Sequence, residues 1–173
     1  MVKKMSEWIF IGIDPGQSGA IAVINEKQDI LEVVDWPGDE VKAADIVRRV
    51  STSCLPLNTP IRAALEKVAA MPKQGVSSTF KFATNYGIWK GILAALKIPF
   101  IEVRPQAWQK GIVSKKQDGV NKPSVAAAAR MFPTAELFGP KGGKKDGRAD
   151  ALLIAEFCRK QFITEKQVER KRR

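Results

Sequence analysis

Three short apolar runs dominate the first 35 residues, and tight-turn signals separate them. The first run covers 8–14 and ends in an Asp-Pro-Gly sequence, the second covers 19–25, and the third covers 30–35. Runs of this length between Pro and Gly signals favour β-strands, and very short connections favour antiparallel neighbours. The start of the chain therefore predicts a hairpin followed by a third strand.

Beyond residue 35 the pattern changes to strands separated by helices. Apolar runs predict strands at 61–65 and 99–103, whereas helical spacing predicts helices at 39–51, 77–96, 123–131 and 148–163, with a short turn at 106–110. Together these segments predict an α/β fold in which helices flank a five-stranded mixed sheet, with three antiparallel and then two parallel strands. At 173 residues we expect one domain over 1–163, followed by a basic tail over 164–173.

The chain contains no histidine. This excludes Ser/His and Cys/His nucleophile pairs, zinc sites with imidazole ligands, and imidazole as a general base. The two cysteines, Cys54 and Cys158, have no CxxC spacing, which favours reduced thiols in a cytosolic protein. No apolar run approaches the ~18 residues of a membrane span, and the run at 8–14 is interpreted as a strand rather than a signal peptide.

Basic side chains are in excess and are unevenly distributed. The chain has 29 Lys and Arg against 18 Asp and Glu, a net charge of +11, and a pI of about 9.8. Residues 1–100 carry a net charge of +2, and residues 101–173 carry +9. This asymmetry favours a nucleic acid as the partner, with solubility as the simpler alternative. The basic clusters are Lys115-Lys116, Lys122, Lys141 with Lys144-Lys145, and the tail from Arg170 to Arg173.

Two acidic residues end apolar runs. Asp14 closes the first strand, and Glu66 follows the run at 61–65. If the two strands are parallel neighbours, their ends lie about 5 Å apart, at the edge where open α/β sheets place their sites. The alternatives are turn formation by Asp14 and a solvent-facing Glu66.

Two further acids lie on the apolar stripe of the last helix. At about 100° per residue, Asp146 and Asp150 project on the same side as Leu153, Ile154 and Phe157. That stripe must pack against the sheet, where an unpartnered carboxylate costs several kcal/mol and two of them also repel. The alternative is that both aspartates only stabilise the start of the helix.

Four carboxylates that converge on one edge need positive charge among them. Oxygen ligands select Mg²⁺ or Mn²⁺ among the common metals. Two such ions about 3.5 to 4 Å apart can activate water and stabilise the leaving oxygen of a phosphodiester. In a basic protein, this pattern predicts a metal-dependent nuclease.

Three segments also resemble a known family. They read IGIDPGQSGA at 11–20, ALEKV at 64–68 and DGRADALLIA at 146–155. In this order and spacing they resemble the RuvC family of Holliday junction resolvases, most of all its small phage-encoded branch. The resemblance implies a ribonuclease H-like fold, a homodimer, two Mg²⁺ or Mn²⁺ per active site, and paired nicks across a four-way DNA junction. It also implies a cytoplasmic location, in the host cell if the protein is phage-encoded.

The same resemblance implies roles for individual residues. Asp14, Glu66 and Asp150 match the family's first-strand aspartate, fourth-strand glutamate and last-helix aspartate. Asp146 stands four positions before Asp150, where the bacterial pattern has three, and stays on the same helix face. Lys110 and Lys122 resemble the family's basic residues near the scissile phosphate.

The family also places an aromatic wedge shortly after the glutamate. Here Met71, Phe80 or Phe82 would take its place, and core packing is the alternative for the phenylalanines. We expect Lys73, Phe80 and the lysines of the basic clusters to contact DNA. The long helix after residue 77 is a candidate dimer interface by resemblance.

Two other functions stay open at this point. A related nuclease that cuts structured RNA would share the fold and the acids. A branched-DNA-binding module without catalysis would keep the basic surface but would not need all four carboxylates. The phosphate-binding hairpin of the actin and sugar-kinase folds is excluded, because those folds need two lobes.

Overall fold

The computed structural model describes residues 8–54, 59–67, 75–113, 123–139 and 143–172. Its elements, in chain order, are β1 (Ile9–Asp14), β2 (Ala20–Asn25), β3 (Ile30–Asp35), α1 (Glu40–Cys54), β4 (Ile61–Glu66), α2 (Val76–Ala95), β5 (Phe100–Val103), α3 (Pro105–Gln109), α4 (Pro123–Met131) and α5 (Asp146–Arg172).

The five strands form one mixed sheet in the order β3-β2-β1-β4-β5. The pairs β1–β2 and β2–β3 are antiparallel, whereas β1–β4 and β4–β5 are parallel. The predicted α/β fold is therefore confirmed, including the change from antiparallel to parallel pairing. Strand β1 lies at the centre, and helices cover both of its faces, which explains its unbroken apolar run.

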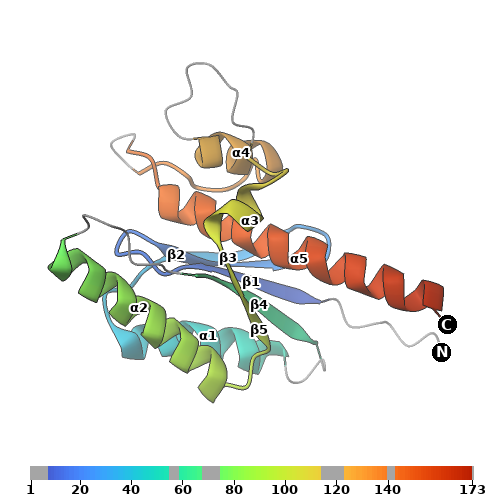
Figure 1. The fold of residues 1–173 in the computed structure, drawn as a ribbon, viewed down its shortest axis with the longest axis horizontal. Helices are drawn as coiled ribbons and strands as arrows, with labels where there is room; N and C mark the ends of the chain where they lie inside the picture. The colour runs from blue at the N-terminus through green and yellow to red at the C-terminus, as the bar shows by residue number, and fades with distance from the viewer. Residues whose placement is uncertain (1–7, 55–58, 68–74, 114–122, 140–142, 173) are drawn as a thin grey trace.

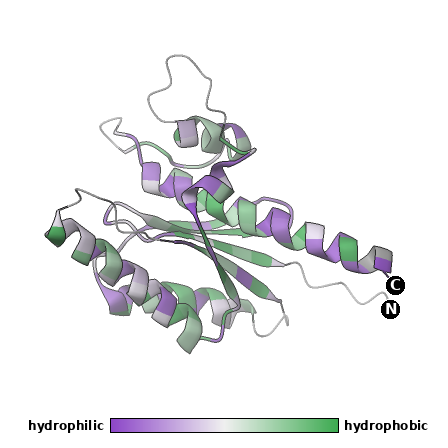
Figure 2. Ribbon diagram, in the orientation of Figure 1, coloured by the Kyte–Doolittle hydropathy of each residue, from purple (hydrophilic) through white to green (hydrophobic). Residues whose placement is uncertain are grey.

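The sheet separates two apolar layers (Figure 1). Helices α1 and α2 lie on one face, and α3, α4 and α5 lie on the other. Successive residues of a strand point to opposite faces, so Ile11 and Ile13 pack with Trp89 under α1 and α2, whereas Phe10 packs with Leu152 under α5. Figure 2 shows the corresponding apolar colouring of the central strands and of the part of α5 that crosses them.

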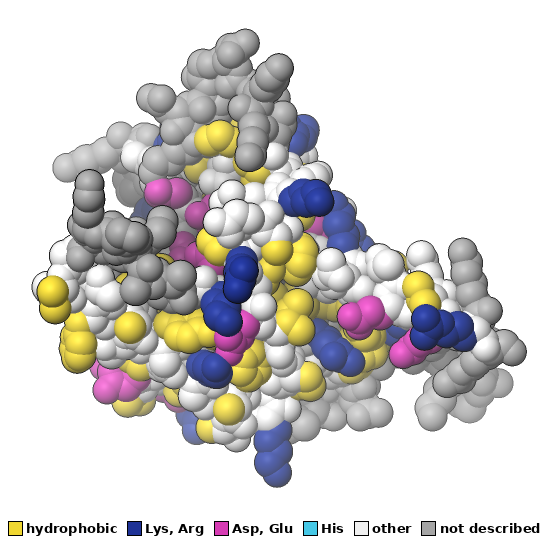
Figure 3. All heavy atoms as spheres, viewed as in Figure 1, with side chains coloured by type: hydrophobic (Ala, Val, Ile, Leu, Met, Phe, Trp, Pro, Cys, Tyr) yellow, Lys and Arg dark blue, Asp and Glu magenta, His cyan; other side chains and the backbone are white. Residues whose placement is uncertain are grey.

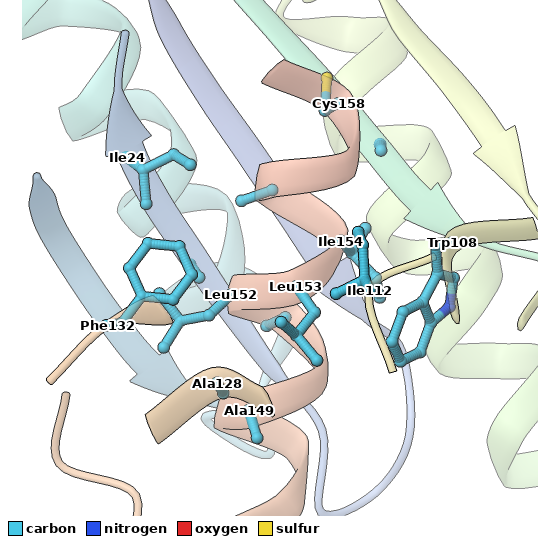
Figure 4. Close-up of a cluster of buried hydrophobic side chains, with 14 of the residues drawn as sticks. Ile24, Trp108, Ile112, Ala128, Phe132, Ala149, Leu152, Leu153, Ile154 and Cys158 are labelled. Atoms are coloured by element: carbon cyan, nitrogen blue, oxygen red, sulfur yellow. The ribbon is translucent and has the colours of Figure 1, made fainter. Parts of the chain in front are cut away.

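Helix α5 is buried on nearly all sides where it crosses the sheet. Every residue from Ala151 to Glu156 is buried, because β1 and β2 contact one side and α4 contacts the other. Figure 4 shows the contact with α4, where Ala128 lies beside Ala149 and Phe132 lies near Leu152. A Cβ on Gly12 would lie 2.1 Å from the carbonyl oxygen of Ala151. Glycine at this position therefore allows α5 to pack directly on β1.

The predicted limits of the last helix, 148 and 163, are wrong. Helix α5 begins at Asp146 and continues to Arg172, through the stretch expected to form a basic tail. Beyond the sheet, the Phe162 ring packs on the Trp8 ring with their centroids 3.9 Å apart. The Lys166 ammonium lies 4.8 Å from the Phe162 centroid and 4.6 Å from the Trp8 centroid. The residues that follow are mostly good helix formers without Gly or Pro, so the helix has no local reason to stop.

Both cysteines are buried and form no disulfide. In the parts of the chain that the structure describes, no helix has the length and apolar character that crossing a membrane requires.

Candidate active site

Asp14 and Glu66 lie at the same edge of the sheet. Strands β1 and β4 are parallel neighbours, and Ile13 pairs with Leu65, so the two acids occupy the next register position. Asp14 also has the turn role that its sequence allows, because its Oδ1 accepts a hydrogen bond from the Gly16 N–H at 2.9 Å. The turn and the acidic cluster therefore use the same side chain.

The start of α5 brings Asp146 and Asp150 to this edge. A Cβ on Gly147 would lie 2.0 Å from the Ser18 carbonyl oxygen and 2.7 Å from the Gly19 Cα. The first turn of α5 therefore packs directly against the β1–β2 turn. Figure 3 shows acidic side chains gathered around the start of α5.

The acids influence one another electrostatically. Burial raises the pKa of Asp14, the hydrogen bond from Gly16 lowers it, and the charge of Asp146 raises it further. The pKa of Glu66 is raised to about 7, first by burial and then by Asp14, against a hydrogen bond from Trp108, with Asp150 adding to the rise. Asp146 is thus close enough to Asp14, and Asp14 and Asp150 are close enough to Glu66, for their charges to disfavour ionisation of those two acids.

Trp108 is a site neighbour that the sequence did not reveal. Its indole Nε1–H donates to Oε1 of Glu66 at 2.8 Å, and the two residues are 42 positions apart in the chain. A buried tryptophan generally finds an acceptor for its N–H, which is the only sequence signal that was available.

A second feature missed by the sequence analysis is an ionic clasp between β3 and α5, formed by Asp35, Lys145 and Arg148. Arg148 donates from Nε to Oδ1 of Asp35 at 2.7 Å and from Nη2 to Oδ2 at 3.2 Å, and Lys145 Nζ donates to Oδ2 at 2.8 Å. The hydrogen bond from Arg148 is the main reason that the pKa of Asp35 is lowered. The clasp fixes the start of α5, which carries Asp146 in its first turn and Asp150 one turn later.

The predicted DNA contacts fall into three groups. Phe80 is 72% exposed, and two lysines are also exposed: Lys110, directly after α3, and Lys144, two residues before α5. Lys145 is engaged in the clasp with Asp35. Outside the described residues lie Lys73, Lys115, Lys116, Lys122 and Lys141, together with Met71.

Phe80 and Phe82 differ in their surroundings. Phe82 is half-buried, and its Cε2 would lie 3.7 Å from a Cβ on Gly16, in the turn that follows Asp14. Core packing therefore does not account for Phe80. Phe82 packs beside the edge of the sheet that carries Asp14, Glu66, Asp146 and Asp150, called the acidic edge below.

The donor chemistry at this edge fits a hard divalent cation. All four side chains offer carboxylate oxygens, and a cation would relieve the burial and repulsion that raise the pKa values of Asp14 and Glu66. Among the described residues, no group of three or more acidic or cysteine side chains stands in a geometry that could hold a metal ion.

The chain matches no model of a known protein family and no curated protein. Two solved structures of RuvC from Thermus thermophilus are similar to it. RuvC in complex with a Holliday junction substrate is 17% identical, with a TM-score of 0.56 over 87% of this chain and 91% of that chain. A second T. thermophilus RuvC structure is 16% identical, with a TM-score of 0.52 over 86% of this chain and 92% of that chain. The fold is therefore the ribonuclease H-like fold of RuvC.

Proposed function

We propose that this protein is a metal-dependent endonuclease that resolves Holliday junctions and other branched DNA by paired phosphodiester nicks. The observation that carries the proposal is the convergence of four carboxylates, from β1, β4 and α5, on one edge of a RuvC-like sheet. The T. thermophilus RuvC structure with a Holliday junction supports branched DNA as the substrate class. The segments at 11–20, 64–68 and 146–155 support assignment to the small phage-encoded branch of that family.

In this proposal Asp14, Glu66, Asp146 and Asp150 hold two Mg²⁺ or Mn²⁺ ions. When bound, these ions supply the Lewis acidity that phosphodiester hydrolysis requires. The carboxylates act as ligands that bind and orient. The whole nuclease is assigned to one domain over 1–163, and its last helix α5 continues from there to Arg172.

The basic side chains bind the DNA backbone. Lys110, directly after α3, and Lys144, two residues before α5, are exposed, and the exposed Phe80 offers an apolar surface for bases at a branch point. We assign the same role to Lys73, Lys115, Lys116, Lys122, Lys141 and Lys145. Each lysine neutralises phosphate charge, which also reduces repulsion between the DNA and the acidic edge.

A homodimer completes the proposal. A two-fold dimer presents two sites to a two-fold four-way junction, so it places symmetric nicks. The exposed side of α2, with Gly87 and Gly91, is the candidate interface. Such an enzyme would act in the cytoplasm, of the host cell if it is phage-encoded.

The decisive experiment is nicking of a synthetic four-way junction with Mg²⁺ or Mn²⁺. We expect paired, symmetric nicks, and we expect Asp14→Asn to lower their rate by at least roughly a hundredfold while junction binding persists. Asp45→Asn is the matched control, because Asp45 is an exposed acid on α1, paired with Arg48. Cleavage by Asp14→Asn at the wild-type rate would refute the mechanism.

The same assay separates the two alternative functions. Faster cleavage of structured RNA than of the junction, at equal salt, would identify an RNA-processing nuclease. Junction binding without calorimetric uptake of Mg²⁺ or Mn²⁺ would identify a non-catalytic binding module. The retention of all four acids favours the nuclease over that module.

A further inference from the structure

Trp108 joins the apolar core to the acidic edge. It lies in α3, a five-residue helix that Pro105 begins directly after β5. Its side chain is fully buried, and Figure 4 shows the ring beside Ile112 and Ile154. The indole nitrogen is the one polar atom of this side chain, and it bonds to Oε1 of Glu66 at 2.8 Å.

Glu66 needs such a contact to stay at the edge. Its side chain has three rotatable bonds and is half-buried, and the charges of Asp14 and Asp150 oppose its ionised form. Repulsion of this kind favours rotation of the carboxylate toward solvent. The hydrogen bond from Trp108 is the contact that favours the ionised group in place.

An indole N–H is well suited to this task. It donates and cannot accept, and it carries no charge that would compete with a cation. The packed core around Trp108 fixes its ring. The indole N–H therefore keeps one position whether or not a cation is bound at the acidic edge.

We infer that Trp108 is a positioning residue, whose buried indole N–H holds one oxygen of Glu66 so that this carboxylate faces the other acids before divalent ions bind. This inference rests on the proposed function, because it assigns Glu66 to metal binding. It adds a residue from α3, an element that none of the four acids belongs to.

The chain offers a matched control in Trp89. This residue is also fully buried, on the opposite face of the sheet, where the centroids of its ring and the Trp36 ring are 5.3 Å apart. Its Nε1 has no hydrogen-bond acceptor among the described residues. Trp89→Phe and Trp108→Phe therefore remove the same atoms from equally buried sites, and only the second removes a bond to the acidic edge.

The first experiment measures Mn²⁺ binding by calorimetry on the full chain. We expect Trp108→Phe to weaken Mn²⁺ binding roughly tenfold, as is typical for loss of a group that orients a metal ligand, and Trp89→Phe to change it less than about twofold. In a Glu66→Gln background, Trp108→Phe should have no further effect on Mn²⁺ affinity, because it acts through Glu66. Equal effects of the two Trp→Phe changes would overturn the inference.

A second measurement does not depend on the folding of Trp108→Phe. The chain has four tryptophans, so four indole N–H resonances are expected by NMR. We expect Glu66→Gln to shift the Trp108 indole resonance and to leave that of Trp89 in place. An unmoved Trp108 resonance would overturn the inference even if Mn²⁺ binds.

The two experiments also separate this inference from the proposed function. If the wild-type protein takes up no Mn²⁺, the proposed function fails, and the positioning role fails with it whatever the indole resonance shows. If the wild type binds Mn²⁺ and nicks junctions but Trp108→Phe behaves like Trp89→Phe, only the role of Trp108 is refuted.

Discussion

At the scale of single residues, the acidic edge opposes folding when no cation is bound. Glu66 and Asp14 are both held in surroundings that raise their pKa, because burial and neighbouring carboxylates disfavour the charged form. A folded state that binds protons more tightly than the unfolded chain is most stable where those protons are present. The acids that are proposed to bind metal should therefore make the metal-free protein less stable as the pH rises from acidic to neutral.

We expect the metal-free protein to lose stability as the pH rises. Glu66 has an ordinary pKa of 4.5 and a pKa of about 7 in the folded protein. Its contribution to the free energy of unfolding is therefore complete below pH 4.5 and is lost as the pH rises to about 7. The loss over this window should be on the order of 3 kcal/mol, measured by urea denaturation with a chelator at pH 5 and pH 8.

Two comparisons test this assignment. Glu66→Gln, which cannot ionise, should remove most of the pH dependence, whereas Asp45→Asn on α1 should leave it unchanged. Added Mg²⁺ should restore stability at pH 8, because a ligand that binds only the folded state stabilises it. A metal-free protein whose stability is the same at pH 5 and pH 8 would contradict the burial of these acids.

The sequence singled out the acids of the candidate site but not the side chains that contact them. Asp14, Glu66, Asp146 and Asp150 were recognisable because each interrupts an apolar pattern whose period is local. The bond from Trp108 to Glu66 spans 42 positions, and that from Arg148 to Asp35 spans 113. Such contacts depend on how the elements pack, and no local pattern encodes which way a buried donor points.

At the scale of elements, periodicity predicted the strands and helices to within a few residues, except at the ends of α5. The strand of 61–65 is Ile61–Glu66, and the helix of 123–131 has the predicted limits. The far end of α5 was missed although its residues are good helix formers, and there Lys166 lies over the ring of Trp8, at the other end of the chain. The all-round burial of α5 was also missed, since a single helix pattern does not show that α4 covers its second face.

The position of α5 depends on Gly147, and two nearby glycines allow a matched test. A Cβ at Gly147 would lie 2.0 Å from the Ser18 carbonyl oxygen, whereas a Cβ at Gly143 would meet nothing within 4 Å. We expect Gly147→Ala to displace the first turn of α5, with a loss of about 1–3 kcal/mol and a corresponding fall in Tm. Junction nicking should fall as well, because the same turn carries Asp146, and Asp150 follows it one turn later.

Gly143→Ala should leave both the Tm and the nicking rate at wild-type values. Thermal unfolding and the junction assay measure the two effects on the same samples. If Gly147→Ala unfolds at the wild-type temperature, α5 does not pack on the β1–β2 turn as described.

At the scale of the whole molecule, charge and fold divide the protein into two sides. The net charge of +11 comes mainly from residues 101–173, which carry +9 and contribute α3, α4 and α5 to one face of the sheet. Helices α1 and α2 on the other face belong to the half with a net charge of +2. The sequence predicted this asymmetry, and the fold shows that the described helices from that half, α3, α4 and α5, share the face of the sheet where α5 begins.

If this basic face binds junction DNA, affinity should fall steeply with salt. Neutralising phosphates releases counterions, so we expect at least about a hundredfold loss of affinity between about 50 and about 200 mM salt. Each lysine that contacts a phosphate should contribute about one unit to the slope of log affinity against log salt. Lys110→Gln and Lys144→Gln should therefore each reduce the slope by about one unit, whereas Lys42→Gln, on α1 at the opposite face, should not. A salt-independent affinity would show that the lysines do not neutralise phosphates. An equal effect of Lys42→Gln would show that the positive charge acts through the whole molecule, and that the face with α3, α4 and α5 is not the DNA-binding face.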